Sequence, residues 1–218
     1  MNCGKGTLLL YAVTDRSWLN GKSLGQAVRE AIEGGATMIQ LREKEMDTEA
    51  LIREAREIGR ICREYKTPFV VNDSVEAALA AGADGVHVGQ KDMEAGRVRE
   101  LLGPDKILGV SVQTADQARL ACERGADYLG VGAVFPTGTK TDAKSVSVQE
   151  LKAICQAVRI PVVAIGGISR ENAALLEGSG IQGIAVVSAV FAQKDIRAAA
   201  RGMREAAEWL TAAALEKE

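Results

Sequence analysis

The chain has 218 residues, of which 47% are hydrophobic, enough for one large core and a single domain. Its 27 basic and 29 acidic residues give a net charge of -2, which excludes an overall positive field that would hold nucleic acid or an anionic membrane. The apolar runs are too short to span a membrane, and four scattered cysteines without a C-x-x-C pair favour a reducing compartment. Because the N-terminus also lacks a signal-peptide core, we expect a cytoplasmic protein, and we leave a homo-oligomeric state open.

Short β-branched apolar runs alternate with longer amphipathic segments along the whole chain. The expected strands are Leu8–Val13, Thr37–Leu41, Phe69–Asn72, Asp84–Val88, Ile107–Ser111, Tyr128–Gly132, Val162–Ile165 and Gly183–Val187. The expected helices are Leu24–Glu33, Thr48–Tyr65, Val75–Ala80, Glu94–Leu102, Ala115–Glu123, Val148–Ala157, Arg170–Leu176 and Ile196–Ala213. This alternation predicts an α/β fold, a single-domain (β/α)8 TIM barrel over residues 1–218 with loose ends at 1–6 and 214–218.

A weak internal repeat of glycine-containing segments precedes the second, fourth, sixth and eighth strands. These segments are 34–36, 81–84, 124–127 and 178–180, and each offers a glycine that can end the preceding helix. The spacing favours a barrel of four βαβα quarters over an open doubly wound sheet, which the sequence alone does not exclude. Alternation also places Gly109, Ser111, Gly130 and Gly132 inside the barrel, where small residues either leave room for a ligand or admit bulky neighbours.

Two cations and an amide close the second strand. If the extended conformation continues to Lys44, then Gln40, Arg42 and Lys44 leave the backbone on the same side. Two cations held together become favourable when a multiply charged anion such as a diphosphate lies between them. The alternative is a strand end with solvated charges, in which Arg42 pairs with a neighbouring glutamate.

Two aspartates follow adjacent strands, and in a barrel the residues after the strands share one rim. Asp73 and Asp92 are therefore expected close enough to bind one hard cation, and magnesium takes one or two carboxylates and completes its shell with water and phosphate oxygens. With one histidine and no clustered cysteines, zinc is not expected. The alternative for each aspartate is the N-cap of the helix that follows.

The loops after the seventh and eighth expected strands hold Gly166-Gly167 and Val187-Ser188. In TIM barrels, exposed backbone N–H groups at this position bind a monophosphate, although a Gly-Gly pair also makes ordinary turns. The chain thus offers a cationic, metal-assisted anion site and a neutral, backbone-lined one. Two phosphorylated substrates, or one substrate with two phosphates, are implied.

Three further residues have both a functional and a structural interpretation. His87, the single histidine, lies within an expected strand, where a hydrogen-bonded barrel histidine is favoured over a catalytic base. Ser111 could donate to a leaving-group oxygen or merely fill space. Lys140, on the long polar loop 135–147, could close over a phosphate or remain solvated.

The residues in this order resemble thiamine-phosphate synthase, and the resemblance covers nearly the whole chain. The motifs that carry it are Tyr11–Asp15, Gln40–Lys44, Val71–Asp73, Gly82–Asp92, Phe135–Lys140, Ala164–Ile168 and Val187-Ser188. The family joins 4-amino-2-methyl-5-(diphosphooxymethyl)pyrimidine to a thiazole phosphate, or its carboxylated form, and releases diphosphate.

The resemblance implies a role for each matching position. It implies magnesium on Asp73 and Asp92, and catalytic roles for Arg42, Lys44, Ser111 and Lys140. The residues implied to hold the pyrimidine diphosphate are Gln40, Leu41, Arg42, Glu43, Lys44, Asn72, Ser111 and Lys140. Those implied for the thiazole phosphate and the loop beside it are Thr137, Gly138, Thr139, Gly167, Val187 and Ser188.

Two positions depart from the family pattern. Ser74 stands where a second acidic residue often follows Asn-Asp, and Gln113 replaces a frequent histidine, so no proton-transfer role is expected there. Two alternative functions are a thiazole tautomerase, which needs one substrate only, and a non-catalytic barrel that binds a thiamine precursor. Tautomerases tend to lack the Asn-Asp, downstream Asp and Thr-x-Thr-Lys elements that this chain contains.

Overall fold

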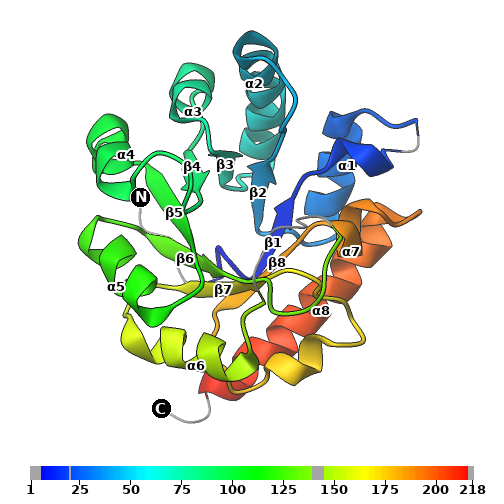
Figure 1. Ribbon diagram of the computed structural model, residues 1–218. Helices are drawn as coiled ribbons and strands as arrows, with labels where there is room; N and C mark the ends of the chain where they lie inside the picture. The colour runs from blue at the N-terminus through cyan, green and yellow to red at the C-terminus, as the bar shows by residue number, and fades with distance from the viewer. Residues whose placement is uncertain (1–5, 20, 139–144, 216–218) are drawn as a thin grey trace.

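Eight parallel strands close into a barrel in the computed structural model, which describes residues 6–19, 21–138 and 145–215 (Figure 1). The strands are β1 (Leu10–Val13), β2 (Met38–Leu41), β3 (Phe69–Asn72), β4 (Gly85–Val88), β5 (Ile107–Val112), β6 (Tyr128–Val131), β7 (Val162–Ile165) and β8 (Gly183–Val186). Each strand pairs with the next in chain order, and β8 pairs with β1. The expected (β/α)8 barrel is confirmed, and the open sheet is excluded.

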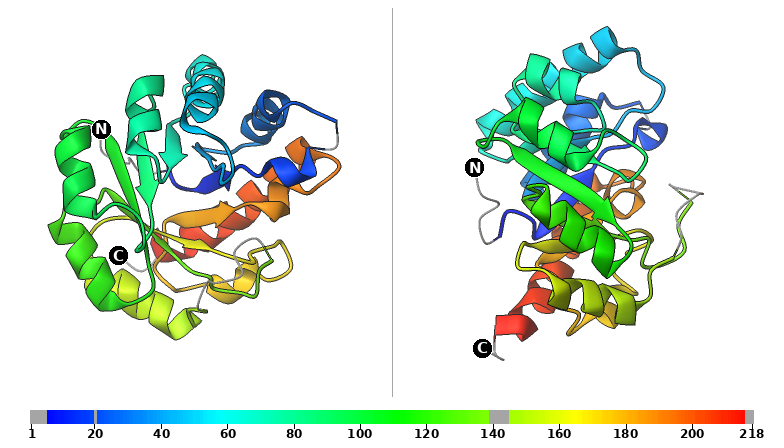
Figure 2. Two further views of the ribbon diagram at one scale, coloured as in Figure 1. Left: turned by 45° about the horizontal axis from the view of Figure 1, so that its top comes forward. Right: turned by 60° about the vertical axis from the view of Figure 1, so that its left-hand side comes forward.

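Helices surround the barrel on all sides, as the two further views of Figure 2 show. They are α1 (Leu24–Glu33), α2 (Thr48–Glu64), α3 (Val75–Ala81), α4 (Ala95–Leu102), α5 (Ala115–Glu123), α6 (Val148–Ala157), α7 (Ser188–Phe191) and α8 (Ile196–Leu215). Two 3-10 turns, η1 (Arg16–Trp18) and η2 (Ala173–Leu176), complete the described elements. In the described ranges, no helix has the length and apolar character needed to cross a membrane.

Local sequence explains where the helices begin. A side chain at the N-cap accepts a hydrogen bond from a backbone N–H of the first turn in α1 to α6. These caps are Ser23, Asp47, Ser74, Glu94, Thr114 and Ser147. Two of them, Ser23 and Ser147, form reciprocal capping boxes with Gln26 and Glu150.

The expected helix Arg170–Leu176 is wrong, because only the short 3-10 turn η2 forms there. The side chain of Asn172 accepts from the backbone N–H of Ser169 at 2.8 Å and donates to the carbonyl of Gly167 at 2.8 Å. Asn172 thereby holds the preceding residues in a turn, and its side chain does not cap the first turn of a helix. The other expected elements either have the observed bounds or differ from them by one or two residues at their ends.

The strands separate two hydrophobic layers. The larger layer lies between strands and helices and includes Leu129 and Val131 of β6. The smaller layer fills the barrel interior and consists of Leu8, Tyr11, Val13, Met38, Val70, Ile107, Tyr128, Val163 and Ala185. Since Leu129 and Val131 face the helices, Gly130 faces inward, as the alternation predicts.

The internal repeat corresponds to a set of hydrogen bonds at the end of the barrel where the strands begin. The residue just before each even-numbered strand accepts, through its side chain, from a backbone N–H of the preceding odd-numbered strand, at 2.7–2.9 Å. The pairs, acceptor first, are Thr37–Leu10, Asp84–Phe69, Asp127–Leu108 and Gln182–Val162. Each repeat also contains a glycine with positive φ, of which Gly82 is the left-handed helix cap. The same strand-to-strand hydrogen bond therefore recurs in all four quarters of the barrel, although the fourth quarter has the 3-10 turn η2 in place of its first helix.

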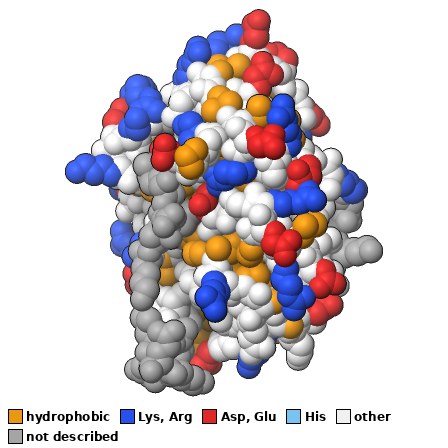
Figure 3. Space-filling model, turned by 90° about the vertical axis from the view of Figure 1, so that its left-hand side faces the viewer, with side chains coloured by type: hydrophobic (Ala, Val, Ile, Leu, Met, Phe, Trp, Pro, Cys, Tyr) orange, Lys and Arg blue, Asp and Glu red, His pale blue; other side chains and the backbone are white. Residues whose placement is uncertain are grey.

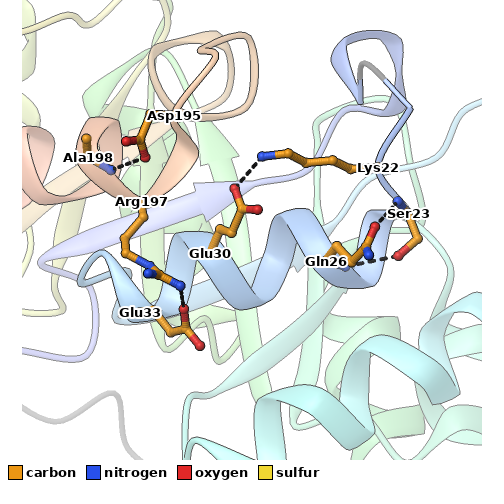
Figure 4. Close-up of polar contacts among 8 residues, drawn as sticks. All are labelled: Lys22, Ser23, Gln26, Glu30, Glu33, Asp195, Arg197 and Ala198. Carbon is orange, nitrogen blue, oxygen red and sulfur yellow. Dashed lines mark hydrogen bonds and ion pairs between the residues drawn. The ribbon is translucent and has the colours of Figure 1, made fainter.

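The last helix closes the ring against the first (Figure 4). Arg197 of α8 forms an ion pair with Glu33 of α1, and Lys22 bonds Glu30 at 2.6 Å. The helices approach so closely at Gly34 that a Cβ there would lie 2.4 Å from the carbonyl oxygen of Arg197. Glycine is thus required at this seam.

The outer surface has mixed charge. Figure 3 shows acidic and basic side chains intermixed with small apolar groups on the face covered by α4 and α5. The exposed large hydrophobic side chains of the described residues are Tyr65, Leu79, Met93, Leu101, Leu120, Leu175 and Trp209. The described cysteines Cys62, Cys122 and Cys155 are free thiols.

Candidate active site

A cavity of about 350 Å³ lies at the end of the barrel where the strands end. Residues from every strand, or from the loop that follows it, line this cavity. The predicted site residues among them are Gln40, Arg42, Lys44, Asn72, Asp73, Asp92, Ser111, Thr137, Gly167, Val187 and Ser188. Residues far apart in the sequence thus converge as the barrel topology requires.

The remaining predicted residues do not line the cavity or lie outside the described chain. Leu41 is fully buried in the layer between barrel and helices, and Glu43 bonds Arg16 at 2.8 Å. Residues 41 and 43 alternate with 40, 42 and 44, so their side chains leave the backbone on the other side. Gly138 is exposed and is not part of the lining, whereas Thr139 and Lys140 lie outside the described residues.

The end of β1 fixes the end of β2. The backbone N–H of Thr14 donates to the carbonyl of Gln40 at 2.9 Å, and the N–H of Arg42 donates to the Thr14 hydroxyl at 3.0 Å. Thr14 is fully buried, so this clamp cannot shift without disturbing the core. Although β2 ends at Leu41, the clamp extends the alternation, and Gln40, Arg42 and Lys44 all reach the cavity.

The two aspartates are held by backbone contacts and cap no helix. Asp73 has φ of 62°, a left-handed conformation that few residues other than glycine adopt, and its N–H donates to the carbonyl of His87 at 2.8 Å. Asp92 accepts from the N–H of Gly89 at 2.7 Å. Because Ser74 and Glu94 are the caps of α3 and α4, the alternative of an N-cap is excluded for both aspartates.

This donor set fits a magnesium ion better than a transition metal. In the described ranges, no cluster of three or more histidine, cysteine or acidic side chains could hold a metal. Two exposed carboxylates on one cavity wall match a cation that keeps water and takes further oxygen ligands from a phosphorylated substrate.

The glycine pair after β7 permits a close backbone approach from the loop after β6. A Cβ at Gly166 would lie 2.6 Å from the Cβ of Ala133, and one at Gly167 would lie 2.4 Å from the carbonyl oxygen of Pro136. The N–H of Phe135 donates to the carbonyl of Gly166 at 3.0 Å. The pair therefore forms a tight loop contact and also lines the cavity beside Val187 and Ser188, and phosphate binding by its backbone stays a prediction.

Five polar residues of the cavity wall were not among the predicted site residues: Tyr11, His87, Gln90, Lys91 and Gln113. Gln90 donates to the carbonyl of Ser111 at 2.8 Å, and Gln113 donates to the carbonyl of Gly132 at 3.3 Å. His87 is hydrogen-bonded to Tyr128 and Ser111, which agrees with the preferred interpretation of a bonded barrel histidine. The sequence does contain a signal for Tyr11: it lies two residues before Val13, so both side chains leave β1 on the same side, which faces the barrel interior.

Known proteins resemble this chain over nearly its full length. A family model described as thiamine monophosphate synthase matches residues 10–190. A thiamine-phosphate synthase of Ruminiclostridium cellulolyticum is 50% identical over 90% of this chain and 93% of its own, and one of Clostridium tetani is 48% identical over 87% and 91%. The solved structure of a thiamine phosphate pyrophosphorylase from Pyrococcus furiosus superposes with a TM-score of 0.87 at 42% identity, covering 94% of this chain and 98% of its own.

Proposed function

The chain belongs to the thiamine monophosphate synthase family, and we propose that its barrel-end cavity catalyses the family's condensation with magnesium at Asp73 and Asp92. It is a transferase of thiamine biosynthesis that forms thiamine phosphate. Its substrates are the diphosphorylated aminopyrimidine and a thiazole phosphate, plain or carboxylated.

One observation carries the assignment of the site: a single cavity has two chemically different walls. The wall from β2 to β4 supplies Arg42, Lys44, Asp73 and Asp92, and the wall from β7 and β8 supplies the loop backbone near Gly167 and Ser188. The first wall suits a diphosphate and the second suits a monophosphate. Both substrates can therefore lie in one cavity with their reacting atoms between the walls.

Catalysis at this site consists of stabilising a leaving group. When the methylene–oxygen bond ionises, negative charge grows on the departing diphosphate, and the aminopyrimidine ring delocalises the positive charge left on the carbon. Arg42, Lys44 and Ser111 line the cavity; in this proposal the two cations would stabilise the diphosphate, and the Ser111 hydroxyl would donate to one of its oxygens. The thiazole nitrogen then forms the new carbon–nitrogen bond, so the chain needs no nucleophile of its own.

Asp73 and Asp92 would hold the magnesium ion, which when bound supplies positive charge to the diphosphate oxygens. Two observations support this proposal: both aspartates line the cavity, and the backbone contacts of Asp73 and the Gly89–Asp92 hydrogen bond hold them there. We expect an excess of chelator to abolish turnover and added magnesium to restore it. Undiminished turnover in chelator would overturn the metal assignment.

The second wall would bind the thiazole phosphate through Thr137, Gly167, Val187 and Ser188. Asn172 donates to the carbonyl of Gly167 at 2.8 Å and so fixes the loop that presents this wall. Roles for Thr139 and Lys140 at the phosphates rest on the family resemblance alone.

The function is tested by supplying both precursors and then omitting each in turn. We expect thiamine phosphate and diphosphate only when both precursors and magnesium are present. Conversion of the thiazole in the absence of the pyrimidine would instead indicate a tautomerase. Binding of either precursor without any product would indicate a non-catalytic barrel.

A further inference from the structure

A chain of hydrogen bonds crosses the barrel interior beneath the cavity. Gln40 Nε2 donates to the Tyr11 hydroxyl at 2.5 Å, and the hydroxyls of Tyr11 and Tyr128 lie 2.7 Å apart. The Tyr128 hydroxyl lies 2.9 Å from His87 Nδ1, and His87 Nε2 lies 2.8 Å from Ser111 Oγ. The chain thus connects the diphosphate-binding end of β2 with the serine of β5.

Barrel register and two glycines make room for this chain. His87 pairs with Gly109, and Gly109 pairs with Tyr128 across adjacent strands. A Cβ at Gly109 would lie 2.2 Å from Tyr128 Cζ and 2.5 Å from His87 Nδ1, and one at Gly130 would lie 3.2 Å from His87 Cε1. At Gly109 the inward glycine therefore admits bulky neighbours and leaves no empty space.

The first four members of the hydrogen-bond chain are buried, so their hydrogen-bond directions are constrained. Tyr128 is 0% exposed, Tyr11 1%, Gln40 4% and His87 8%. Buried polar atoms need partners, and successive bonds in a low-dielectric interior reinforce one direction. A direction imposed at one end is therefore transmitted to the other.

Gln40 imposes that direction because its amide nitrogen can only donate. With Gln40 as donor to the Tyr11 oxygen, the direction consistent with these contacts has the Tyr11 hydroxyl donating to Tyr128 and the Tyr128 hydroxyl donating to His87 Nδ1. This direction requires the His87 proton on Nε2, from which His87 donates to Ser111 Oγ. The Ser111 hydrogen is left to point into the cavity that Ser111 lines.

We propose that Tyr11, Tyr128 and His87 are positioning residues that transmit the orientation of the Gln40 amide to Ser111. Ser111 thereby meets the departing diphosphate as a hydrogen-bond donor, a role that rests on the proposed function. In the reversed direction Ser111 would donate to His87 and turn its lone pairs toward the anion. Reversal therefore replaces an attraction by a repulsion without moving a heavy atom.

The tautomer of the single histidine reports the direction of the chain directly. In ligand-free protein labelled with ¹⁵N-histidine, a long-range ¹H–¹⁵N correlation spectrum should show one neutral imidazole protonated at Nε2. A proton on Nδ1, or an imidazolium at neutral pH, would overturn the proposal. Because no substrate is present, this outcome is decided independently of synthase activity.

Two substitutions then test the transmission. Gln40→Glu replaces the donor by an acceptor, so the histidine should switch to the Nδ1-protonated tautomer. Tyr128→Phe removes a hydroxyl that does not line the cavity, and it should mix the tautomers and lower kcat about tenfold with KM changed less than about threefold. An unchanged tautomer in Gln40→Glu, or wild-type kcat in Tyr128→Phe, would refute the mechanism.

The third tyrosine of the protein, Tyr65, lies outside the hydrogen-bond chain and provides a matched control. The hydroxyl of Tyr65 donates to Glu33 at 2.8 Å on the outer surface, between α2 and α1. Tyr65→Phe should leave the tautomer, kcat and KM unchanged. If Tyr128→Phe does not fold, Tyr11→Phe cuts the same chain one bond earlier and should produce the same mixed tautomers, and a single Nε2-protonated form there would also refute the mechanism.

Discussion

Removal of the Arg42 guanidinium should lower the rate about a hundredfold. Two unit charges about 4 Å apart interact by about 4 kcal/mol at an effective dielectric constant of about 20, which suits a half-buried site. Because the charge on the leaving group is only partly developed in the transition state, we expect Arg42→Ala to lose about 3 kcal/mol, or about two orders of magnitude in kcat/KM. Arg42→Lys keeps the charge but loses the planar fork, so we expect a smaller loss of about tenfold.

The assay is steady-state release of diphosphate with both precursors and magnesium present. The fold should survive, since the contact of residue 42 with Thr14 uses the backbone N–H, which alanine retains. The matched control is Arg53→Ala, because Arg53 is exposed and pairs with Glu49 at 3.7 Å along α2. Arg42→Ala with kcat/KM within threefold of wild type would show that the diphosphate binds elsewhere.

Two further predictions concern stability. Asp127 accepts a hydrogen bond from the β5 backbone at 2.8 Å and one from Arg99 at 2.6 Å, so Asp127→Ala should lower the free energy of unfolding in urea by about 3 kcal/mol. Asp116 is exposed, so the control Asp116→Ala should lower it by less than about 0.5 kcal/mol. Equal effects of the two substitutions would contradict a stabilising role of the repeated hydrogen bond between strands. Burial raises the pKa of the Cys62 and Cys155 thiols from 9.0 to about 12, so above pH 9 these thiols ionise in the unfolded chain and remain protonated in the folded one. The free energy of unfolding should therefore fall by about 1.4 kcal/mol per pH unit for each thiol between pH 9 and 12. In a variant with both cysteines replaced by alanine, the free energy of unfolding measured in urea should depend less steeply on pH over this range.

The barrel was predictable because its local and global signals agree. Each β-branched run is short, α1 to α6 each begin with a side-chain cap, and polar residues follow the strands on one rim. The placement of Asp73 and Asp92 at one cavity followed from the parallel topology alone. The hydrogen bonds of Asp84 and Asp127 to the preceding strands also give a physical reason for the weak repeat.

The remaining features depend on contacts between segments that are distant in the sequence. The sequence around Asn172 predicts a helix, and only the structure shows that the Asn172 side chain binds the carbonyl of Gly167. The chain through Tyr11, Tyr128 and His87 requires the register of strands β4, β5 and β6, which no local pattern specifies. The direction of the hydrogen-bond chain further depends on the amide of Gln40 acting as a donor to Tyr11, and the sequence identified Gln40 only as one of the donors at a strand end.

The most direct test of the two-walled site is a crystal structure with thiamine phosphate, diphosphate and magnesium bound. We expect diphosphate between Arg42 and Lys44, with magnesium on Asp73 and Asp92. We expect the thiazole phosphate at the backbone near Gly167 and Ser188. Diphosphate at the wall formed by β7 and β8, or magnesium bound without either aspartate, would contradict it.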